Sequence, residues 1–353
     1  MKHKSLLQFI LLGFIFAFLA TSCVKEGPMG PAGADGTDGT DGTDGVDGNV
    51  TCLACHSGTS MEAIQAQFAM SVHRAGLVAV DYAGGRAACA QCHSHEGFTQ
   101  YATFGLVLGD ITNPTAWKCN TCHGIHKSFE TKDYALRLTD PIHPAFDPTT
   151  TMDLKGNSNL CANCHQSRTA EPLKVKPGEE TFKITSAHYG PHHGAQANVV
   201  AGVGFAEIAG SVQYPAAGSN FHLSHNSEAV SCVGCHMGTY SAGSKGGGHT
   251  WKPNLSACVE CHGSEMTDYN YGGVQTEVEH LLVQLRDRLV ELGVVEFVEA
   301  DNAYEPVVGT YPMAQARAFF NWVGLEEDRS LGAHNPKYVK ALLLNSIEAL
   351  QAY

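Results

Sequence analysis

Six copies of a Cys-x-x-Cys-His motif carry the most distinctive chemistry in the sequence. Two cysteines three residues apart, with a histidine directly behind them, suit covalent haem attachment, because the thiols can form thioethers and the histidine can bind the iron. Structural zinc, iron–sulfur clusters and redox disulfides also use Cys-x-x-Cys, but none of them requires the histidine. The sequence therefore predicts six covalently bound haem c groups. The thioether cysteines are Cys52, Cys55, Cys89, Cys92, Cys119, Cys122, Cys161, Cys164, Cys232, Cys235, Cys258 and Cys261, and the proximal iron ligands are His56, His93, His123, His165, His236 and His262.

Twelve further histidines lie outside the motifs and beyond the N-terminal segment. Six haem irons need at most six of them as distal ligands, and iron ligation is the obvious use of so high a histidine content. His280, on a predicted amphipathic helix, is expected to take no part in ligation. His126, three residues after proximal His123, is expected to bind the iron of the first haem, and His95 and His143 are the alternatives.

The elements that position these ligands are expected to be mostly helices and loops. Apolar residues at helical spacing predict three helices, over residues 278–292, 313–323 and 335–350. Gly293 suits the end of the first helix, and Asn335 suits the N-cap of the third.

Signals for strands are weak, and the best is the run GLVLGDI at residues 105–111. The predicted fold class is mostly α with extensive loops. It is a multihaem cytochrome c fold in which haems fill the core and long helices form the C-terminal part.

Four segments resemble the C-terminal half of multihaem cytochromes in the superfamily of cytochrome c nitrite reductase and hydroxylamine oxidoreductase. They are HNSEAVSCVGCHM at 225–237, GGHTW at 247–251, CVECHG at 258–263 and GAHNPKYVKALL at 332–343. The resemblance spans about 160 residues and implies four distal ligands. They are His225 for the Cys258/Cys261 haem, His249 for the Cys119/Cys122 haem, His334 for the Cys232/Cys235 haem and His73 for the Cys161/Cys164 haem.

The same resemblance raises the question of a catalytic haem at Cys89/Cys92. In that superfamily the catalytic haem usually has a lysine in place of the motif histidine and an open iron position, whereas this motif has His93. His193 resembles the substrate histidine of the family, with His192 next to it, but Arg86 is not at the family spacing. The segment QSRTAEP also replaces an acidic and aromatic segment of the family. We therefore expect His193 to be a distal iron ligand, and we assign no catalytic residue.

The N-terminus predicts export from the cytoplasm. A short basic region followed by an apolar run from 6 to 20 is typical of a signal peptide, here residues 1–22, and the run is short for a membrane span. Cys23 stands where a bacterial lipoprotein would be cleaved and lipidated, although Ala20 occupies the usual place of a leucine. Lipidation of Cys23 is the expectation, and an uncleaved anchor helix is the alternative.

A collagen-like repeat separates Cys23 from the first motif. Glycine occurs at every third position from Gly27 to Gly48, but only Pro28 and Pro31 supply imino acids. An extended acidic tether over residues 23–49 is therefore expected, and a collagen triple helix is the alternative. Residues 50–353 are expected to form the hexahaem domain, with haem binding in 50–265 and C-terminal helices in 274–353.

These features together predict an electron-transfer protein. It would pass electrons along closely packed haems to a redox partner protein or an extracellular acceptor. The lipid would bind it to the outer membrane, on the periplasmic or the cell-surface side. The net charge of −13 opposes a nucleic-acid partner. The alternative is a reductase of nitrite or hydroxylamine at an open haem, and self-association stays open.

Overall fold

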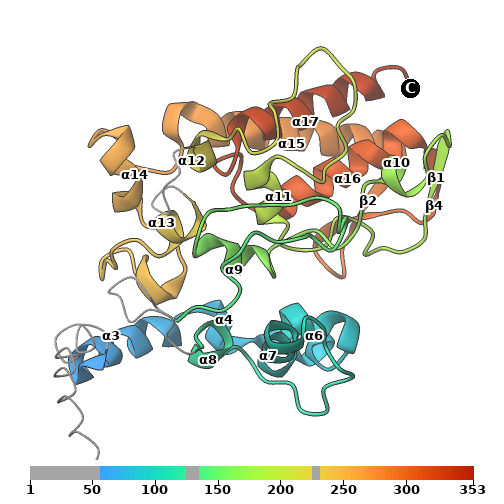
Figure 1. Cartoon of the computed structure of the whole chain (residues 1–353). Helices are drawn as coiled ribbons and strands as arrows, with labels where there is room; N and C mark the ends of the chain where they lie inside the picture. Colours follow the sequence, from blue (N-terminus) through green and yellow to red (C-terminus); the bar gives the residue numbers. More distant parts are fainter. Residues whose placement is uncertain (1–55, 125–134, 225–230) are drawn as a thin grey trace, which may run out of the picture. The chain divides into compact units, whose positions relative to one another are not determined.

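The computed structural model describes residues 56–124, 135–224 and 231–353 (Figure 1). Contacts divide the chain into two units, Met1–Gly48 and Asn49–Tyr353, and the described residues all belong to the second. None of the described helices combines the length and the apolar character of a membrane-spanning helix. Several predicted features lie outside the described residues. They are the signal peptide, Cys23, the tether, Cys52, Cys55, His126 and His225.

Residues 58–104 form a series of short helices, and one more helix follows a loop. Serine side chains begin three of them: Ser57, Ser71 and Ser94 each accept a hydrogen bond from a backbone N–H of the first turn. Their bounds are α3 Gly58–Ala69, α4 Val72–Ala75, α5 Leu77–Ala79, the π-helix η1 Val80–Gly84, α6 Ala87–His93, α7 His95–Phe104 and α8 Cys119–Cys122.

The weak strand signal at residues 105–111 does not correspond to a strand in the structure. Gly105 ends α7 in the left-handed conformation, with φ 75°, and the run that follows it is a loop. Two backbone N–H groups of this loop donate hydrogen bonds to groups outside any strand. Leu108 N donates to Gln100 Oε1 at 3.0 Å, and Ile111 N donates to Gly85 O at 2.8 Å. Leu108 is 65% exposed, so the apolar residues of this run do not form the buried face that a strand needs.

The middle of the chain is rich in loops between short helices, so the predicted class, mostly α with extensive loops, is confirmed. The elements are α9 Ser158–Ala162, α10 Pro172–Val175, β1 Thr181–Ile184, α11 Gln196–Ala201, α12 Phe221–Ser224, α13 Cys232–His236, η3 Gly248–Thr250, α14 Leu255–His262 and η4 Tyr271–Gly273.

The three predicted C-terminal helices are confirmed. They are α15 Val274–Glu291, α16 Met313–Asp328 and α17 Pro336–Leu350. Asn335 caps α17 by accepting a hydrogen bond from Tyr338 N, and its Nδ2 donates to Val199 O at 3.1 Å, which ties the helix start to α11. Gly293 follows α15 with φ 67°, a conformation that glycine adopts without strain.

Three short strands interrupt these helices and were not predicted. β2 Val295–Val298 pairs antiparallel with β3 Ala303–Pro306, and β4 Gly309–Pro312 pairs antiparallel with β1. Each strand has four residues, which is too short for an alternating pattern to be recognised.

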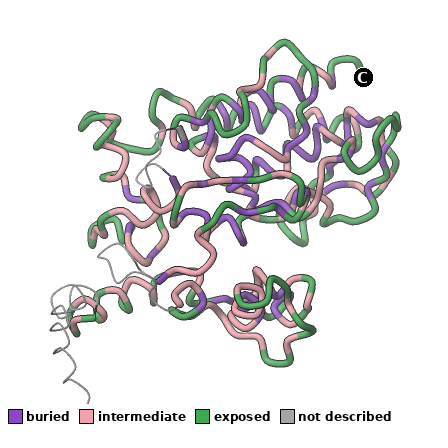
Figure 2. Tube along the Cα trace, in the orientation of Figure 1, coloured by how far each residue is buried: buried purple, intermediate pink, exposed green. Residues whose placement is uncertain are grey.

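The main hydrophobic core lies among α15, α16 and α17, where Figure 2 shows most of the buried positions. Leu285, Phe319 and Leu342 are fully buried in this core, and each contributes roughly 1.5–3 kcal/mol by leaving water. Buried Asn321 links the core to the loop that contains Ala206, because its side chain forms two hydrogen bonds of 2.8 Å with the backbone of Ala206. Of the histidines described next, His334 belongs to this block and lies between α16 and α17.

Candidate haem-binding sites

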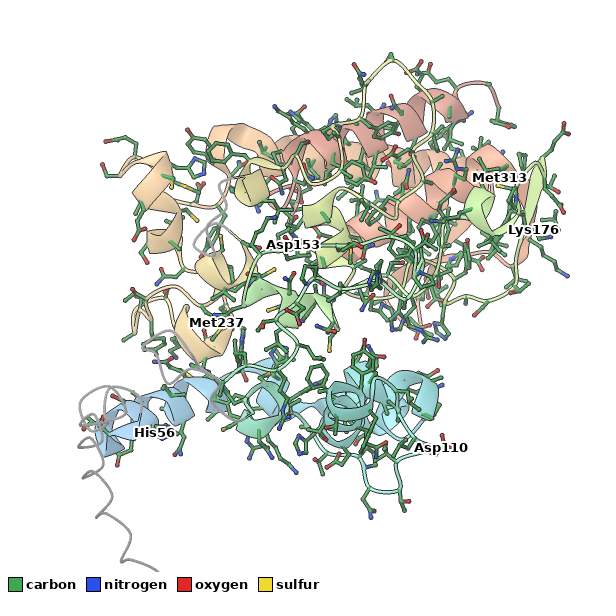
Figure 3. All side chains as sticks on the ribbon, in the orientation of Figure 1. His56, Asp110, Asp153, Lys176, Met237 and Met313 are labelled. Atoms are coloured by element: carbon green, nitrogen blue, oxygen red, sulfur yellow. The ribbon has the colours of Figure 1, made fainter. Side chains whose placement is uncertain are left out.

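Five of the six motifs lie within the described residues, and each sits on a helical turn. Four of them fall at or within α6, α8, α13 and α14, and the fifth begins in α9 and continues as a turn, because His165 N donates to Cys161 O at 2.9 Å. On a helical turn, positions i, i+3 and i+4 share one face, so both thiols and the histidine of a motif point the same way. None of the ten described motif cysteines is part of a disulfide, so disulfide pairing does not compete with thioether formation among them. Of the first motif only His56 is described, directly before α3 (Figure 3).

Proximal His165 faces His73, which the resemblance assigned to the same haem. Their ring centroids are 6.0 Å apart and the ring planes are inclined by 71°. Burial, followed by the charge of His165, lowers the pKa of His73 to about 4, so its ring is neutral at physiological pH. Neutral imidazole is the form that binds a metal. The Nδ1 atom of His165 lies 3.0 Å from Gln196 Oε1, which orients the opposite ring nitrogen away from that amide.

Proximal His123 faces His249, again the partner that the resemblance implied. The ring centroids are 6.4 Å apart with an interplanar angle of 29°. Gln67 in α3 holds the second histidine in place, because its Oε1 accepts a hydrogen bond from His249 N at 3.0 Å. Burial is the largest influence on the pKa of His249 and lowers it.

Proximal His236 faces His334, with ring centroids 6.3 Å apart and an interplanar angle of 39°. Both rings have a fixed partner at Nδ1, which is the usual outer contact of a ligating histidine. His236 Nδ1 lies 2.9 Å from Trp251 O, and His334 Nδ1 lies 2.7 Å from Asp328 Oδ1. Burial acts to lower the pKa of His334, but the Asp328 carboxylate raises it above its ordinary value overall.

The site at Cys89/Cys92 differs from the expectation. The ring facing His93 is that of His192, with centroids 5.9 Å apart and an interplanar angle of 69°. His193 instead bonds Glu327 Oε1 through Nδ1 at 2.7 Å, and its side chain is 76% exposed. His192 has φ 87°, a conformation that is strained for any residue but glycine and costs about 1–3 kcal/mol. The turn therefore directs His192, rather than His193, towards the proximal histidine.

These four histidine pairs have the spacing that a six-coordinate haem iron needs. A metal–imidazole bond is about 2.0 Å long. With the ring centre roughly 1.1 Å behind the nitrogen, two imidazoles on opposite faces of one iron place their ring centroids roughly 6.2 Å apart. The observed separations run from 5.9 to 6.4 Å. The donor set and its spacing thus fit a haem iron between the rings of each pair.

The remaining two motifs are only partly described. His262 of the last motif packs against Tyr271, with ring centroids 4.2 Å apart and an interplanar angle of 51°, and its expected partner His225 is outside the described residues. For the first haem, the alternative His95 has its Nδ1 2.7 Å from Thr121 Oγ1. The other alternative, His143, has its Nδ1 3.0 Å from Thr150 O. His126 is outside the described residues.

Thiols of different motifs lie close together. Cys92 and Cys164 are near enough to influence each other's pKa, and so are Cys161 and Cys232. These two pairs bring together three motifs that are widely separated in the sequence.

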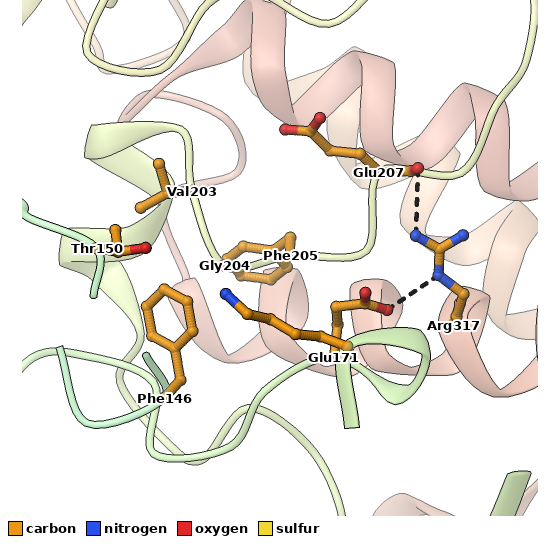
Figure 4. A pocket seen from close by; sticks show the side chains of 9 residues that line it. Phe146, Thr150, Glu171, Val203, Gly204, Phe205, Glu207 and Arg317 are labelled. Carbon is orange, nitrogen blue, oxygen red and sulfur yellow. Dashed lines mark hydrogen bonds and ion pairs between the residues drawn. The ribbon is translucent and has the colours of Figure 1, made fainter. Parts of the chain in front are cut away.

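A cavity of about 230 Å³ lies apart from the motifs, next to α10 and α16 (Figure 4). Its two cationic side chains already have partners. Arg317 Nε donates to Glu171 Oε2 at 3.0 Å, and Lys174 Nζ donates to Asp147 Oδ2 at 2.5 Å. Both cations of the lining are neutralised within the protein, so we assign the cavity no ligand.

Two comparisons with known proteins bear on these sites. Residues 211–352 match the cytochrome c552 family. The fold is similar to that of the outer cell wall cytochrome OcwA, with a TM-score of 0.52 and 18% sequence identity over 82% of this chain and 50% of that protein. The chain thus spans about half the length of OcwA. No curated protein sequence matches significantly. With the family match, the shared fold and the repeated motifs, the prediction is confirmed: the chain is a multihaem c-type cytochrome.

Proposed function

We propose that the chain is a lipid-anchored, hexahaem electron-transfer protein that works outside the cytoplasm. The observation that carries this proposal is the spacing of the four histidine pairs, with ring centroids 5.9–6.4 Å apart. Two imidazoles on one iron fill its axial positions, which suits one-electron transfer and leaves no position for a substrate. The haem supplies the redox chemistry, and the chain supplies its ligands and surroundings.

Each haem would be held by the two thiols and the proximal histidine of its motif. The distal ligands we propose are His73, His192, His249 and His334 for the four described pairs. His225 is proposed for the last haem, and His126, with His95 and His143 as alternatives, for the first. His192 replaces His193 in this set, because His193 bonds Glu327 at the protein surface.

The proximity of thiols from different motifs suggests which haems are neighbours, and so the route that electrons would take. Each motif thiol would be bonded to the edge of its own haem, so two thiols that lie close together bring two haem edges together. The pairs Cys92–Cys164 and Cys161–Cys232 would thus link three haems in a row, with the Cys161/Cys164 haem in the middle. Cys235 lies close enough to Cys258 and Cys261 for their charges to influence it, which would extend the row to the last haem.

A reductase at the Cys89/Cys92 haem is the second candidate function, and one observation favours it. Arg168, Arg86 and His193 all lie close enough to His93 for their charges to lower its pKa, after burial as the largest cause. Positive groups of this kind could stabilise a bound oxyanion such as nitrite. The reaction would require His192 to leave the iron, which separates the two candidates experimentally.

We propose the location and the partners of the protein from its sequence and from the name of the structurally similar protein. An exported chain lipidated at Cys23, with an acidic tether before the first motif, could hold its haems away from a membrane surface. The structurally similar protein is named as an outer cell wall cytochrome. We propose the outer membrane as the site of anchoring. A redox protein or an extracellular acceptor would then be the partner.

Mass spectrometry of the exported protein tests the cofactor content, with six haem additions expected. The Cys23→Ser variant should keep its haems and leave the membrane fraction. Reduced protein should pass electrons to a large or insoluble acceptor. Four haems or fewer, or a reduced protein that no such acceptor can oxidise, would refute the proposal, and a variant that stays membrane-bound would refute the lipid anchor.

A further inference from the structure

Asp328, at the C-terminal end of α16, is almost fully enclosed, with 2% of its side chain exposed. Its Oδ1 accepts the hydrogen bond of His334 Nδ1 at 2.7 Å, and its Oδ2 accepts a hydrogen bond from Ser330 Oγ. Ser330 Oγ in turn accepts a hydrogen bond from His334 N at 3.3 Å. The carboxylate is thus hydrogen-bonded through both oxygens, one of them to the ring edge of a proposed iron ligand. His334 is its ion-pair partner among the described residues.

Other histidines of the proposed pairs have neutral partners at Nδ1. His165 faces the amide oxygen of Gln196, and His236 faces the carbonyl oxygen of Trp251. Glu327, the residue before Asp328, also bonds a histidine, but that histidine is His193, whose side chain is 76% exposed. Water screens a charge at such an exposed position, whereas a buried charge acts at much lower dielectric. Asp328 therefore brings an unscreened negative charge to one haem site.

A buried negative charge near an iron stabilises the ferric state, which carries one more positive charge than the ferrous state. A carboxylate that accepts the Nδ1 proton of a ligating imidazole also makes that ligand more basic. We propose that Asp328 is a positioning residue that lowers the reduction potential of the haem at Cys232/Cys235 through His334. This inference rests on the proposed function, because it takes His334 as the distal ligand of that haem.

The proposed role concerns single-electron transfer only. The iron accepts one electron from a neighbouring haem and passes one electron on, and the proton stays on His334 Nδ1 throughout. A low potential at this position would raise the energy of the electron between the Cys161/Cys164 haem and the last haem. Asp328 would thereby make this haem the energetically uphill step for an electron moving along the row in either direction.

Asp328→Asn in the full-length holoprotein is the direct test, because an amide oxygen can still accept the hydrogen bond while the charge is gone. Glu327→Gln is the matched control, since it removes the neighbouring carboxylate on the same helix end. Potentiometric titration followed by electron paramagnetic resonance should show one haem of Asp328→Asn shifted to a more positive potential. Haem content and low-spin state should equal those of the wild type, and Glu327→Gln should leave that haem unchanged.

His334→Ala identifies the haem concerned and separates the two proposals. The haem that becomes high-spin in His334→Ala must be the one that shifts in Asp328→Asn. Unchanged potentials in Asp328→Asn, or a shift of a different haem, would overturn the role of Asp328 while leaving the proposed function intact. A high-spin haem in Asp328→Asn would also overturn it, because the carboxylate would then only hold the ligand in place. Unchanged low-spin spectra in His334→Ala would instead refute the ligand set of the proposed function.

Discussion

At the scale of single residues, two adjacent histidines are the candidates for the distal ligand of the proposed Cys89/Cys92 haem. The sequence reads Pro-His-His-Gly at 191–194, and spacing alone could not separate His192 from His193. The positive φ of His192 turns its ring towards His93, while His193 meets Glu327. A backbone conformation of this kind depends on tertiary contacts, so no local sequence pattern predicts it.

The first prediction follows from that choice. In ferric holoprotein, His192→Ala should convert one haem to the high-spin state and allow it to bind cyanide or nitrite, because the iron loses its sixth ligand. His193→Ala, the matched control, should leave every haem low-spin. Magnetic circular dichroism distinguishes the spin states. The opposite result, a high-spin haem only in His193→Ala, would restore His193 as the ligand.

Asp147 supports a prediction about pH. It accepts hydrogen bonds from Thr149 N, Thr149 Oγ1 and Thr150 Oγ1, and an ion pair with Lys174 at 2.5 Å holds the pKa of its carboxyl far below the usual range. A carboxyl with a depressed pKa stabilises the fold at neutral pH, and this contribution is lost as the pH falls below the unfolded value of about 4. Asp147→Asn should thus reduce the loss of stability between pH 7 and pH 3.

Denaturant titrations at the two pH values provide the measurement for Asp147. The exposed Asp140, substituted in the same way, is the control, and its variant should keep the wild-type dependence on pH. If Asp147→Asn loses as much stability on acidification as the wild type does, the ion pair with Lys174 has no part in the acid sensitivity.

At the scale of secondary structure, long helices were predictable and short elements were not. The helices α15, α16 and α17 each present an apolar face over at least 15 residues, so their periodicity is clear in the sequence. The strands β1 to β4 have four residues each; β1 and β4 pair although they lie far apart in the chain, whereas β2 and β3 form a short local hairpin. The run at 105–111 shows the converse, since its strand-like composition finds no partner and its leucines stay exposed.

The hydrogen bonds of Asn321 provide a test of how α16 is held against neighbouring segments of the chain. It is fully buried, its Oδ1 accepts from Ala206 N, and its Nδ2 donates to Ala206 O and to Ser346 Oγ at 3.0 Å. Asn321→Ala would leave two buried backbone groups without partners, so we expect a loss of about 2–5 kcal/mol in unfolding free energy. Glu326→Ala, on the exposed face of the same helix, should change stability by less than about 0.5 kcal/mol. Equal effects of the two substitutions would show that these bonds do not secure α16.

At the scale of the whole molecule, attachment motifs could be read directly but ligand pairs could not. A Cys-x-x-Cys-His motif is complete within five residues, because one helical turn aligns its three groups. The paired histidines come from distant segments, as with His73 and His165 or His123 and His249, so their assignment depended on resemblance to a family. Outer contacts such as Asp328 and Gln196 were missed entirely, since no sequence signal marks a residue that bonds a ligand.

Spin-state spectroscopy of the ferric holoprotein tests the central claim most directly, because a haem with two histidine ligands is low-spin and closed to substrate. Electron paramagnetic resonance and magnetic circular dichroism should show every haem low-spin, and added nitrite or cyanide should change neither spectrum. The protein should also fail to reduce nitrite or hydroxylamine at an appreciable rate. A high-spin haem in the unaltered protein that binds nitrite and turns it over would contradict the account, and the chain would then be a reductase.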